Sequence, residues 1–233
     1  MRLAILSDIH SNLEALRSVF DDMDRRQVDR IICLGDIVGY GAEPAACVRL
    51  LRERVSAAVL GNHDAGVLSA ANRSFFSPAA LEALLWTSSR LGEDDLRWLS
   101  TLPYRYSKDD MLFVHAAPRV PEQWEYVFGG MEARRYARYF HERLCFIGHS
   151  HVPGVYPLDP DVREYDTVSR FLINVGSVGQ PRDGDWRACY GVLDSVAGTF
   201  MHIRVEYDVA AAMHAILKTG LPRKLAERLK SGT

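Results

Sequence analysis

The sequence predicts an α/β protein in which helices cover a system of mixed sheets. Short apolar runs alternate with helical patterns in the first third of the chain, which is typical of parallel βαβ units. Beyond Pro103 the pattern changes to closely spaced short strands, so sheet structure dominates there. Because no repeat, low-complexity segment or linker divides the 233 residues, we expect residues 1–233 to form a single domain.

The first third contains three expected strands and two expected helices. The strands are expected over residues 2–6, 30–34 and 57–60. Asn12 can cap a helix whose apolar residues recur at helical spacing. Pro44 suits the first turn of a second helix, which is expected to end near Arg54.

The middle of the chain is expected to be helical and the remainder mostly strand. Ser77 and Pro78 form a helix start, and a second helix is expected over residues 93–101. A helix near 132–140 interrupts the later strands, and two short helices are expected over 209–230. The later strands are expected over residues 104–107, 111–114, 144–147, 155–158, 171–175, 188–194 and 199–206.

The composition excludes several classes of protein. Lys and Arg number 28 against 30 Asp and Glu, so a general nucleic-acid binder is disfavoured. The four cysteines form no CxxC pair. No apolar run approaches the roughly 20 residues of a membrane span. Met1 leads directly into a strand pattern, and we therefore expect a cytoplasmic protein without membrane partners.

Polar blocks follow five of the apolar runs. They contain Asp8 and His10; Asp36; Asn62, His63 and Asp64; His115; and His149 and His151. Ligands of open α/β sheets bind at the carboxyl ends of strands, so these blocks can converge. Carboxylates, imidazoles and an amide oxygen suit Mn, Fe, Zn, Co or Ni ions. The lack of a cysteine in any block argues against a structural zinc site.

The number of donors predicts a site for two metal ions. A single ion would need only three or four of these side chains. Two ions about 3.5–4 Å apart can clamp a phosphate and generate a hydroxide nucleophile near neutral pH. One carboxylate must bridge the ions, and we choose Asp36 for this role. The candidate ligands are Asp8, His10, Asp36, Asn62, His115, His149 and His151.

The blocks D-x-H, G-D, G-N-H-[DE], H and G-H-x-H, in this order, resemble those of the calcineurin-like metallophosphoesterase superfamily. Residues 174–182 are similar to a segment of its small bacterial and archaeal phosphodiesterases. The resemblance implies a four-layer α-β-β-α sandwich. It also implies two ligand sets, which are Asp8, His10, Asp36 and His151 for one metal, and Asp36, Asn62, His115 and His149 for the other.

The same resemblance implies a catalytic role for His63. This residue would not bind metal but would bind the phosphate and protonate the leaving oxygen, as a general acid with a near-neutral pKa. The attacking group would be a hydroxide that bridges the two metals, with Mn as the first choice of metal and Fe, Zn, Ni or Co as alternatives. Asp64 is a candidate for orienting His63.

Two residues depart from the pattern of the Ser/Thr protein phosphatases. Gly39 and Tyr40 stand where those enzymes carry an Asp and a phosphate-clamping Arg. With less fixed positive charge, a monoanionic phosphodiester is favoured over a dianionic monoester. Arg182 is the first candidate for a replacement phosphate contact and Arg119 the second. Tyr40 can form a pocket wall, although loop packing for Tyr40 and a surface position for Arg182 are equally open.

The function favoured by these residues is hydrolysis of a small-molecule or nucleotide phosphodiester. The alternatives are a phosphomonoesterase, a nuclease with the same chemistry, and a non-catalytic scaffold that binds protein partners. Trp124, Tyr126 and Phe128 can form a hydrophobic rim or a contact in a homo-oligomer, with ordinary packing favoured. The other histidines, His141, His202 and His214, match no block and are expected to be structural.

Overall fold

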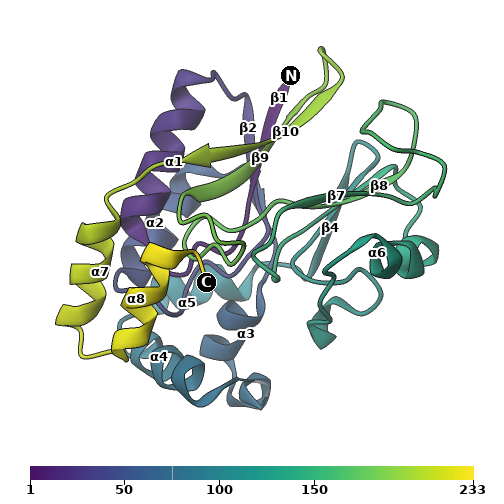
Figure 1. The fold of residues 1–233 in the computed structure, drawn as a ribbon. Helices are drawn as coiled ribbons and strands as arrows, with labels where there is room; N and C mark the ends of the chain where they lie inside the picture. The colour runs from purple at the N-terminus through teal and green to yellow at the C-terminus, as the bar shows by residue number, and fades with distance from the viewer. Residues whose placement is uncertain (75) are drawn as a thin grey trace.

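Two sheets pack face to face, and helices lie on their outer sides (Figure 1). The computed structural model describes residues 1–74 and 76–233. The strand order is β10-β9-β1-β2-β3 in the first sheet and β4-β5-β6-β8-β7 in the second. Helices α1, α2 and α7 cover the first sheet, and α6 covers the second (Figure 1). The predicted α-β-β-α order of layers is therefore confirmed.

The element boundaries follow the expected pattern closely. The strands are β1 (Arg2–Leu6), β2 (Arg30–Cys33), β3 (Ala57–Ala58), β4 (Arg105–Lys108), β5 (Met111–Val114), β6 (Leu144–Ile147), β7 (Gly154–Pro157), β8 (Phe171–Asn174), β9 (Ala188–Asp194) and β10 (Thr199–Val205). The helices are α1 (Leu13–Arg25), α2 (Pro44–Arg54), α3 (Asn62–Leu68), α4 (Pro78–Ser88), α5 (Glu93–Ser100), α6 (Gly130–Tyr136), α7 (Val209–Lys218) and α8 (Arg223–Ser231). Short 3₁₀ turns occupy Ala70–Arg73, Pro121–Gln123 and Ala137–Tyr139.

Strand direction brings the carboxyl ends of the central strands to the same side. β1, β2 and β3 run parallel in the first sheet, as do β5, β6 and β8 in the second. The edge strands β4 and β7 and the β9–β10 hairpin run antiparallel to their neighbours. The loops that leave β1, β2, β3, β5 and β6 can therefore meet.

Alternate residues of β1 show why the layers stack. Leu3 and Ile5 point into the core between the sheets, where Phe113 and Phe146 stack with ring centroids 5.4 Å apart. Ala4 and Leu6, which have the opposite parity, contact the helical layer instead. Because both faces of the strand are buried, its sequence is continuously apolar rather than alternating.

The helix starts follow local capping chemistry. The Asn12 side chain accepts a hydrogen bond from the Ala15 amide at 3.1 Å, as predicted for the start of α1. Ser77 similarly accepts from the Ala80 amide at the start of α4. Among the described residues, no helix combines the length and the hydropathy that a membrane span requires.

Several sequence predictions need correction. β3 has only two residues instead of four, and β4 and β7 are each shifted by one residue. Helix α3 was not expected, because seven residues that include Gly66 carry too short an amphipathic repeat. Gly66 lets α3 pack closely on α4, since a Cβ at this position would lie 2.8 Å from Leu84 Cδ2.

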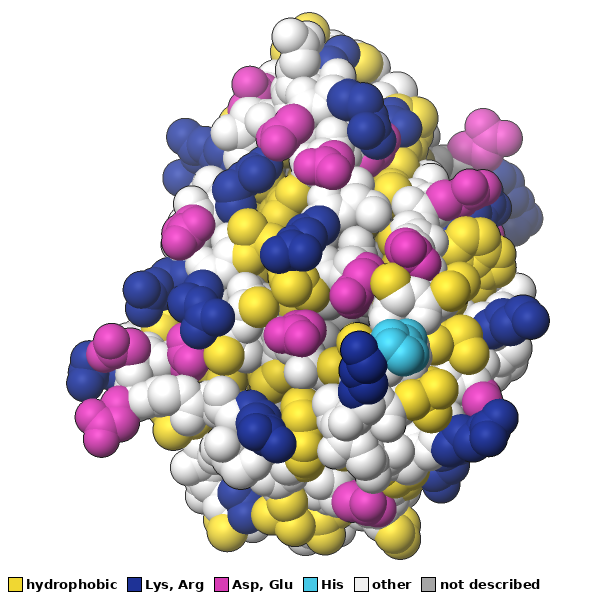
Figure 2. All heavy atoms as spheres, turned by 90° about the vertical axis from the view of Figure 1, so that its left-hand side faces the viewer, with side chains coloured by type: hydrophobic (Ala, Val, Ile, Leu, Met, Phe, Trp, Pro, Cys, Tyr) yellow, Lys and Arg dark blue, Asp and Glu magenta, His cyan; other side chains and the backbone are white. Residues whose placement is uncertain are grey.

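The helix-covered side of the molecule is mixed in charge. Figure 2 shows that Lys and Arg side chains are interspersed there with Asp and Glu, rather than gathered in one basic patch. This agrees with the formal net charge of −2. The four cysteines, Cys33, Cys47, Cys145 and Cys189, are buried free thiols.

Candidate metal centre

The loops after β1, β2, β3, β5 and β6 bring the predicted ligands together at one end of the sheets. Asp8 and His10 follow β1, Asp36 follows β2, and Asn62 begins α3. His115 follows β5, and His149 and His151 follow β6. Asn62 is half-buried and the other six ligand candidates are buried. A cluster of polar groups excluded from water needs partners, and the protein places these groups against one another.

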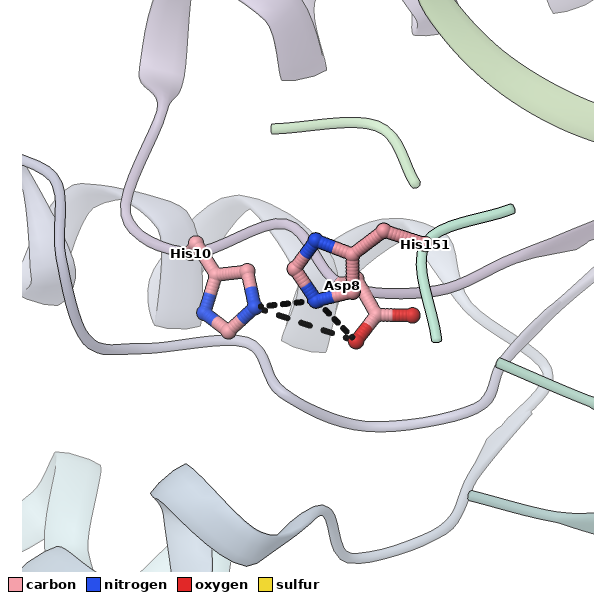
Figure 3. A group of neighbouring side chains, drawn as sticks. All are labelled: Asp8, His10 and His151. Carbon is pink, nitrogen blue, oxygen red and sulfur yellow. Dashed lines mark hydrogen bonds and ion pairs between the residues drawn. The ribbon is translucent and has the colours of Figure 1, made fainter. Parts of the chain in front are cut away.

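The first cluster consists of Asp8, His10 and His151 (Figure 3). Asp8 Oδ1 lies 3.1 Å from His151 Nε2 and 3.7 Å from His10 Nε2. The two imidazole nitrogens lie 3.1 Å apart. All three donor atoms lie within 4.8 Å of one another, which is close enough for one ion to contact them all.

Hydrogen bonds to main-chain carbonyls fix the tautomers in this cluster. His10 Nδ1 lies 3.2 Å from the Val38 carbonyl oxygen, and His151 Nδ1 lies 2.5 Å from that of Gln180. Since a carbonyl only accepts, each Nδ1 must carry the hydrogen and each Nε2 a lone pair. The two Nε2 lone pairs and a carboxylate oxygen thus face one another, and a cation would satisfy all three.

The second cluster consists of Asp36, His115 and His149. His115 Nδ1 donates to the Leu34 carbonyl at 2.8 Å, which leaves the lone pair on Nε2. That Nε2 lies 3.1 Å from His149 Nδ1 and 3.2 Å from Asn62 Oδ1. Asn62 therefore belongs to the same cluster, as the sequence predicts.

Asp36 lies between the two clusters. Its Oδ2 is 3.6 Å from His10 Nε2 and 3.4 Å from His115 Nε2. Its Oδ1 accepts a hydrogen bond from the His63 amide at 2.8 Å, which orients the carboxylate. Among the described residues, the buried His149 Nε2 and Asp8 Oδ1 accept no hydrogen bond. These oxygen and nitrogen donors suit divalent transition-metal ions, and Asp36 is within reach of both clusters.

Burial and charge set the protonation of the ligands. Burial raises the pKa of Asp8 and Asp36, but the charges of neighbouring histidines reverse this, and the net pKa of both carboxyls is lowered. Burial lowers the pKa of His149 to about 3 and lowers that of His151 as well. The carboxylates are therefore ionised and these imidazoles neutral at pH 7, the forms that bind metal.

His115 differs from the other imidazoles. Burial lowers its pKa, but the negative charge of Asp36 more than compensates and raises it to about 9. A metal ion held at Nε2 would require the neutral ring, because it binds the Nε2 lone pair.

The backbone of the ligand loops is strained. Asp8, His10, Asp36, His149 and His151 have φ angles of +55°, +48°, +50°, +67° and +60°. L-residues in this left-handed region cost roughly 1–2 kcal/mol each. Such strain persists where the surrounding structure holds it, and it concentrates at functional sites. The sequence carries no signal for this feature.

His63 lies on the first turn of α3 and is buried. Its ring centroid is 4.5 Å from that of Tyr40 and 4.7 Å from that of Phe76. One ring nitrogen lies within 4.8 Å of donor atoms of His10 and Asp36, so His63 faces the centre. Burial lowers its pKa to about 4, below the near-neutral pKa that the sequence predicts.

Asp64 does not orient His63. Its Oδ1 accepts hydrogen bonds from the amides of Ile37 and Val38 at 3.0 and 3.2 Å, and its Oδ2 accepts from Gly61 at 3.1 Å. His63 Nδ1 has no hydrogen-bond partner among the described residues. Asp64 instead ties the loop after β2 to the start of α3. The prediction that it orients the imidazole is therefore corrected.

A cleft of about 300 Å³ opens over the two clusters. Its walls include Asp36, Tyr40, Asn62, His63, Phe76, Ser77, Ala80, Tyr126, His149, His151, Arg182 and Arg228. Tyr40 and Arg182, the two predicted substrate contacts, thus line this cleft. Arg119 is instead paired with Glu125 at 2.7 Å and does not line the cleft, so its candidacy is withdrawn.

The three aromatic residues after Pro121 have different positions. Trp124 is buried in a small cluster with Leu60 and Ala65, so ordinary packing is confirmed for this residue. Tyr126 is 46% exposed and stacks on His149, with ring centroids 4.0 Å apart. Phe128 is 59% exposed and stacks on Tyr126. Tyr126 and Phe128 therefore form an aromatic rim.

Four cleft residues were not predicted from the sequence, which are Phe76, Ser77, Ala80 and Arg228. Phe76 and Arg228 belong to no motif, and Arg228 lies 46 residues beyond Arg182. Their positions depend on how α4 and α8 pack, which the sequence pattern does not give. The only sequence signal for Arg228 is its place between the buried Leu225 and Leu229 of α8.

Comparison with known proteins agrees with the geometry. Residues 1–198 match the family model of the calcineurin-like phosphoesterase superfamily domain. An uncharacterized protein of Methanocaldococcus jannaschii, MJ0912, is 40% identical, over 99% of this chain and 98% of its own. The crystal structure of a metallophosphoesterase from Sphaerobacter thermophilus is 39% identical, with a TM-score of 0.89 over 100% of this chain and 99% of that chain.

A more distant likeness concerns the fold alone. The hypothetical protein PH1004 of Pyrococcus horikoshii OT3 has 17% sequence identity and a TM-score of 0.83. The match covers 100% of this chain and 98% of that chain. The α-β-β-α layers are thus retained where most residues differ.

Proposed function

We propose that this chain, which belongs to the calcineurin-like phosphoesterase superfamily, is a metal-dependent hydrolase that prefers small phosphodiesters, nucleotide diesters included. The observation that carries the proposal is the convergence of imidazole lone pairs and carboxylate oxygens beneath a cleft lined by Arg182. The converging lone pairs and carboxylate oxygens form a floor of the cleft that suits metal ions. The guanidinium of Arg182 in the cleft wall suits the phosphate that these ions would activate.

Each metal ion has a proposed set of residues. Asp8, His10 and His151 would hold one ion, and Asn62, His115 and His149 the other, with Asp36 shared. Two ions, with Mn²⁺ first and Fe, Zn, Ni or Co as alternatives, would supply a lowered pKa for water and charge neutralisation for the phosphate. The hydrogen bonds from Nδ1 to main-chain carbonyls hold the rings of His10, His115 and His151 ready for this role.

His63 has the position of a hydrogen donor to the substrate. It lines the cleft, and Tyr40 and Phe76 hold its ring from two sides. A neutral imidazole carries one ring hydrogen, which it can donate to a phosphate oxygen. An anionic substrate would raise the pKa of His63 and favour transfer of a proton to the leaving oxygen.

The preference for diesters rests on the charge around the cleft. Tyr40 occupies the place of a phosphate-clamping Arg, and its phenol adds no charge at pH 7. Arg182 lies beside it, with its guanidinium carbon 5.9 Å from the centre of the Tyr40 ring. A diester carries one negative charge on the scissile phosphate, and a monoester carries up to two.

The experiment compares His63→Ala with His141→Ala, a matched variant at an exposed histidine outside the cleft. With Mn²⁺ present, we expect bis-p-nitrophenyl phosphate to be hydrolysed faster than p-nitrophenyl phosphate. His63→Ala should retain the bound metal but lose about 100-fold or more in kcat, the usual scale of general-acid catalysis. His141→Ala should keep both the bound metal and the kcat of the parent chain.

Two results would contradict this proposal. Full activity after exhaustive chelation would exclude a metal-dependent mechanism. A fall in metal content that parallels the loss of activity in His63→Ala would make His63 a ligand rather than a donor to the substrate.

A further inference from the structure

Helix α8 lies outside the part of the chain that the family model matches, yet it contributes to the cleft. The match ends at residue 198, whereas α8 covers Arg223–Ser231. Arg228 nevertheless lines the cleft together with Arg182 and Tyr40. The C-terminal helix therefore adds to the active-site wall a charge that the matched family segment does not supply.

The end of α8 is fixed against the loop that follows Arg182. Gly232, which ends α8 with a φ of +65°, accepts a hydrogen bond at its carbonyl from the Gly184 amide at 2.9 Å. A Cβ at position 232 would lie 2.7 Å from the Asp185 carbonyl carbon, so only glycine allows this approach. Arg228 is one turn earlier and is thereby held close to Arg182.

Both arginines lack an acidic side-chain partner. Within residues 1–74 and 76–233, Arg182 and Arg228 form no ion pair with an Asp or Glu side chain. The Arg182 guanidinium donates to the neutral Gln180 side chain at 2.9 Å, and its Nε is buried without a hydrogen-bond partner among the described residues. Arg228 donates through Nε to the main-chain oxygen of Thr233. Burial and then the charge of Arg182 lower the pKa of Arg228.

The cleft continues past Arg228 into an outer hollow of about 330 Å³. Its walls are Tyr40, Ser77, Ala79, Ala80, Lys224, Leu225 and Arg228, which include two cations and no carboxylate. The first turn of α4 also faces this hollow, and a helix N-terminus adds partial positive charge. Two cations with no acidic neighbour suit an anion better than a nucleobase or a sugar.

We propose that Arg182, Arg228 and Lys224 bind a second phosphate group of the substrate, next to the phosphate held at the metal centre. This inference rests on the proposed function and names its substrate class: nucleoside diphosphate derivatives and other pyrophosphate-linked esters. A guanidinium pair can hold a phosphate through several charge-assisted hydrogen bonds. The scissile phosphate lies over Asp36, and the outer phosphate lies under α8.

Hydrolysis of such a substrate needs water as its only co-reactant. The water oxygen bonds to the inner phosphorus, and the bond from that phosphorus to the bridging oxygen breaks. The bridging oxygen leaves with the outer phosphate, and its electron pair accepts a proton or remains as negative charge. The products are two phosphate monoesters, and the hydrogens of the water end on them or in solvent.

The kinetic test uses two substrates that differ by one phosphate, the p-nitrophenyl esters of thymidine 5′-monophosphate and thymidine 5′-diphosphate. Chromatography quantifies the products of both. Arg228→Met keeps the aliphatic stem against Leu225 and removes only the charge. We expect the ratio of kcat/KM values, diphosphate ester over monophosphate ester, to fall about 10- to 100-fold, mainly through KM. Arg228→Lys should restore part of this ratio.

Arg223→Met is the matched control. It removes the same charge from the same helix, but Arg223 is exposed, pairs with Glu227 at 2.7 Å and does not line the cleft. We expect the ratio to change less than twofold. If Arg223→Met and Arg228→Met lower the ratio equally, the effect is long-range attraction rather than a subsite. If Arg228→Met lowers kcat/KM equally for both esters, Arg228 serves the scissile phosphate and the proposal is overturned.

A binding measurement separates this proposal from the proposed function. Calorimetric titration of the metal-free protein with α,β-methylene-ADP, which resists hydrolysis, needs no catalysis. We expect Arg228→Met to weaken binding about tenfold or more while Arg223→Met binds as the parent chain does. If Arg228→Met binds α,β-methylene-ADP as tightly as the parent chain does, the proposed subsite is overturned, even if the enzyme is active. If Arg228→Met weakens this binding but the protein hydrolyses no phosphoester, the subsite is upheld and the proposed function is rejected.

Discussion

The floor of the cleft, formed by the candidate metal ligands, and its rim, which includes Tyr126 and Phe128, differ in how far they are buried. On the floor Asp8 and His115 are 0% exposed, and main-chain hydrogen bonds join the loop after β1 to that after β2 and the loop after β6 to that after β5. On the rim Tyr126 and Phe128 are 46% and 59% exposed. Such a buried and strained floor admits one arrangement of donors. The rim can change with little cost to the fold, so it is where we expect substrate choice to be set.

The two parts also differ in their origin along the chain. The floor comes from five strand ends, whose order in the sequence follows the order of the polar blocks. The rim comes from the start of α4, the segment after Pro121 and α8, which share no pattern. Substitutions on the floor should therefore affect catalysis for every substrate, and substitutions on the rim should affect only some substrates.

The largest effect is expected on the floor at Asp36. Asp36→Asn keeps the shape and the acceptor for the His63 amide but removes the charge shared by both clusters. We expect loss of at least one bound metal and a fall in activity of about 1,000-fold or more, because in the proposed mechanism the metals would supply most of the transition-state stabilisation. Metal analysis and phosphodiester hydrolysis measure both quantities. The control is Asp109→Asn at an exposed turn, which should change neither.

Substitution of Asp64 should lower the stability of the fold more than it lowers the rate of hydrolysis. Asp64→Ala leaves three buried amides, those of Ile37, Val38 and Gly61, without an acceptor. We expect the free energy of unfolding to fall by about 2–4 kcal/mol, since each unsatisfied buried donor is costly. Chemical denaturation measures this change. A variant with unchanged stability but a selective loss of turnover would instead return Asp64 to a catalytic role.

Gly39 links the floor to His63. Its φ is +93°, and a Cβ there would lie 2.3 Å from His63 Nδ1. Gly184 has a φ of +84° but open space around a Cβ, so Gly184→Ala carries a similar backbone strain without the clash. The strain should cost each variant about 1–2 kcal/mol of stability. Only Gly39→Ala should also lose activity, by about tenfold or more, because it displaces the imidazole. Equal activities of the two variants would show that His63 tolerates displacement.

The smallest effect is expected at the rim. Phe128→Ala removes an exposed ring that contacts Tyr126 but does not line the cleft. We expect less than a twofold change in kcat/KM for bis-p-nitrophenyl phosphate and stability within about 0.5 kcal/mol of the parent. A tenfold loss of activity would mean that the rim takes part in catalysis, and the contrast with the floor would fail.

The contrast between the floor and the rim also explains which features of the site could be predicted from the sequence. The convergence of the candidate ligands Asp8, Asp36 and His115 was predictable because each follows an apolar strand, and parallel strands bring their carboxyl ends together. The lowered pKa of His63 was not predictable, since it depends on burial beside Phe76. Arg228 was also out of reach, because its place depends on packing between segments far apart in the sequence.

Asp64 shows a second limit. The sequence places this carboxylate beside His63, and adjacency suggested a catalytic pair. In the structure the helix geometry of α3 turns it to the amides of the β2 loop instead. Neighbouring positions on a helix face different directions, so adjacency in sequence is weak support for contact.

The most direct test of the central claim is a titration of the metal-free protein with Mn²⁺, with bound metal and bis-p-nitrophenyl phosphate hydrolysis measured on the same samples. We predict that hydrolysis is absent without metal and rises to its maximum as two equivalents bind. Hydrolysis that is complete with no bound metal, or a protein that binds no Mn²⁺, Fe, Zn, Ni or Co at all, would contradict the account.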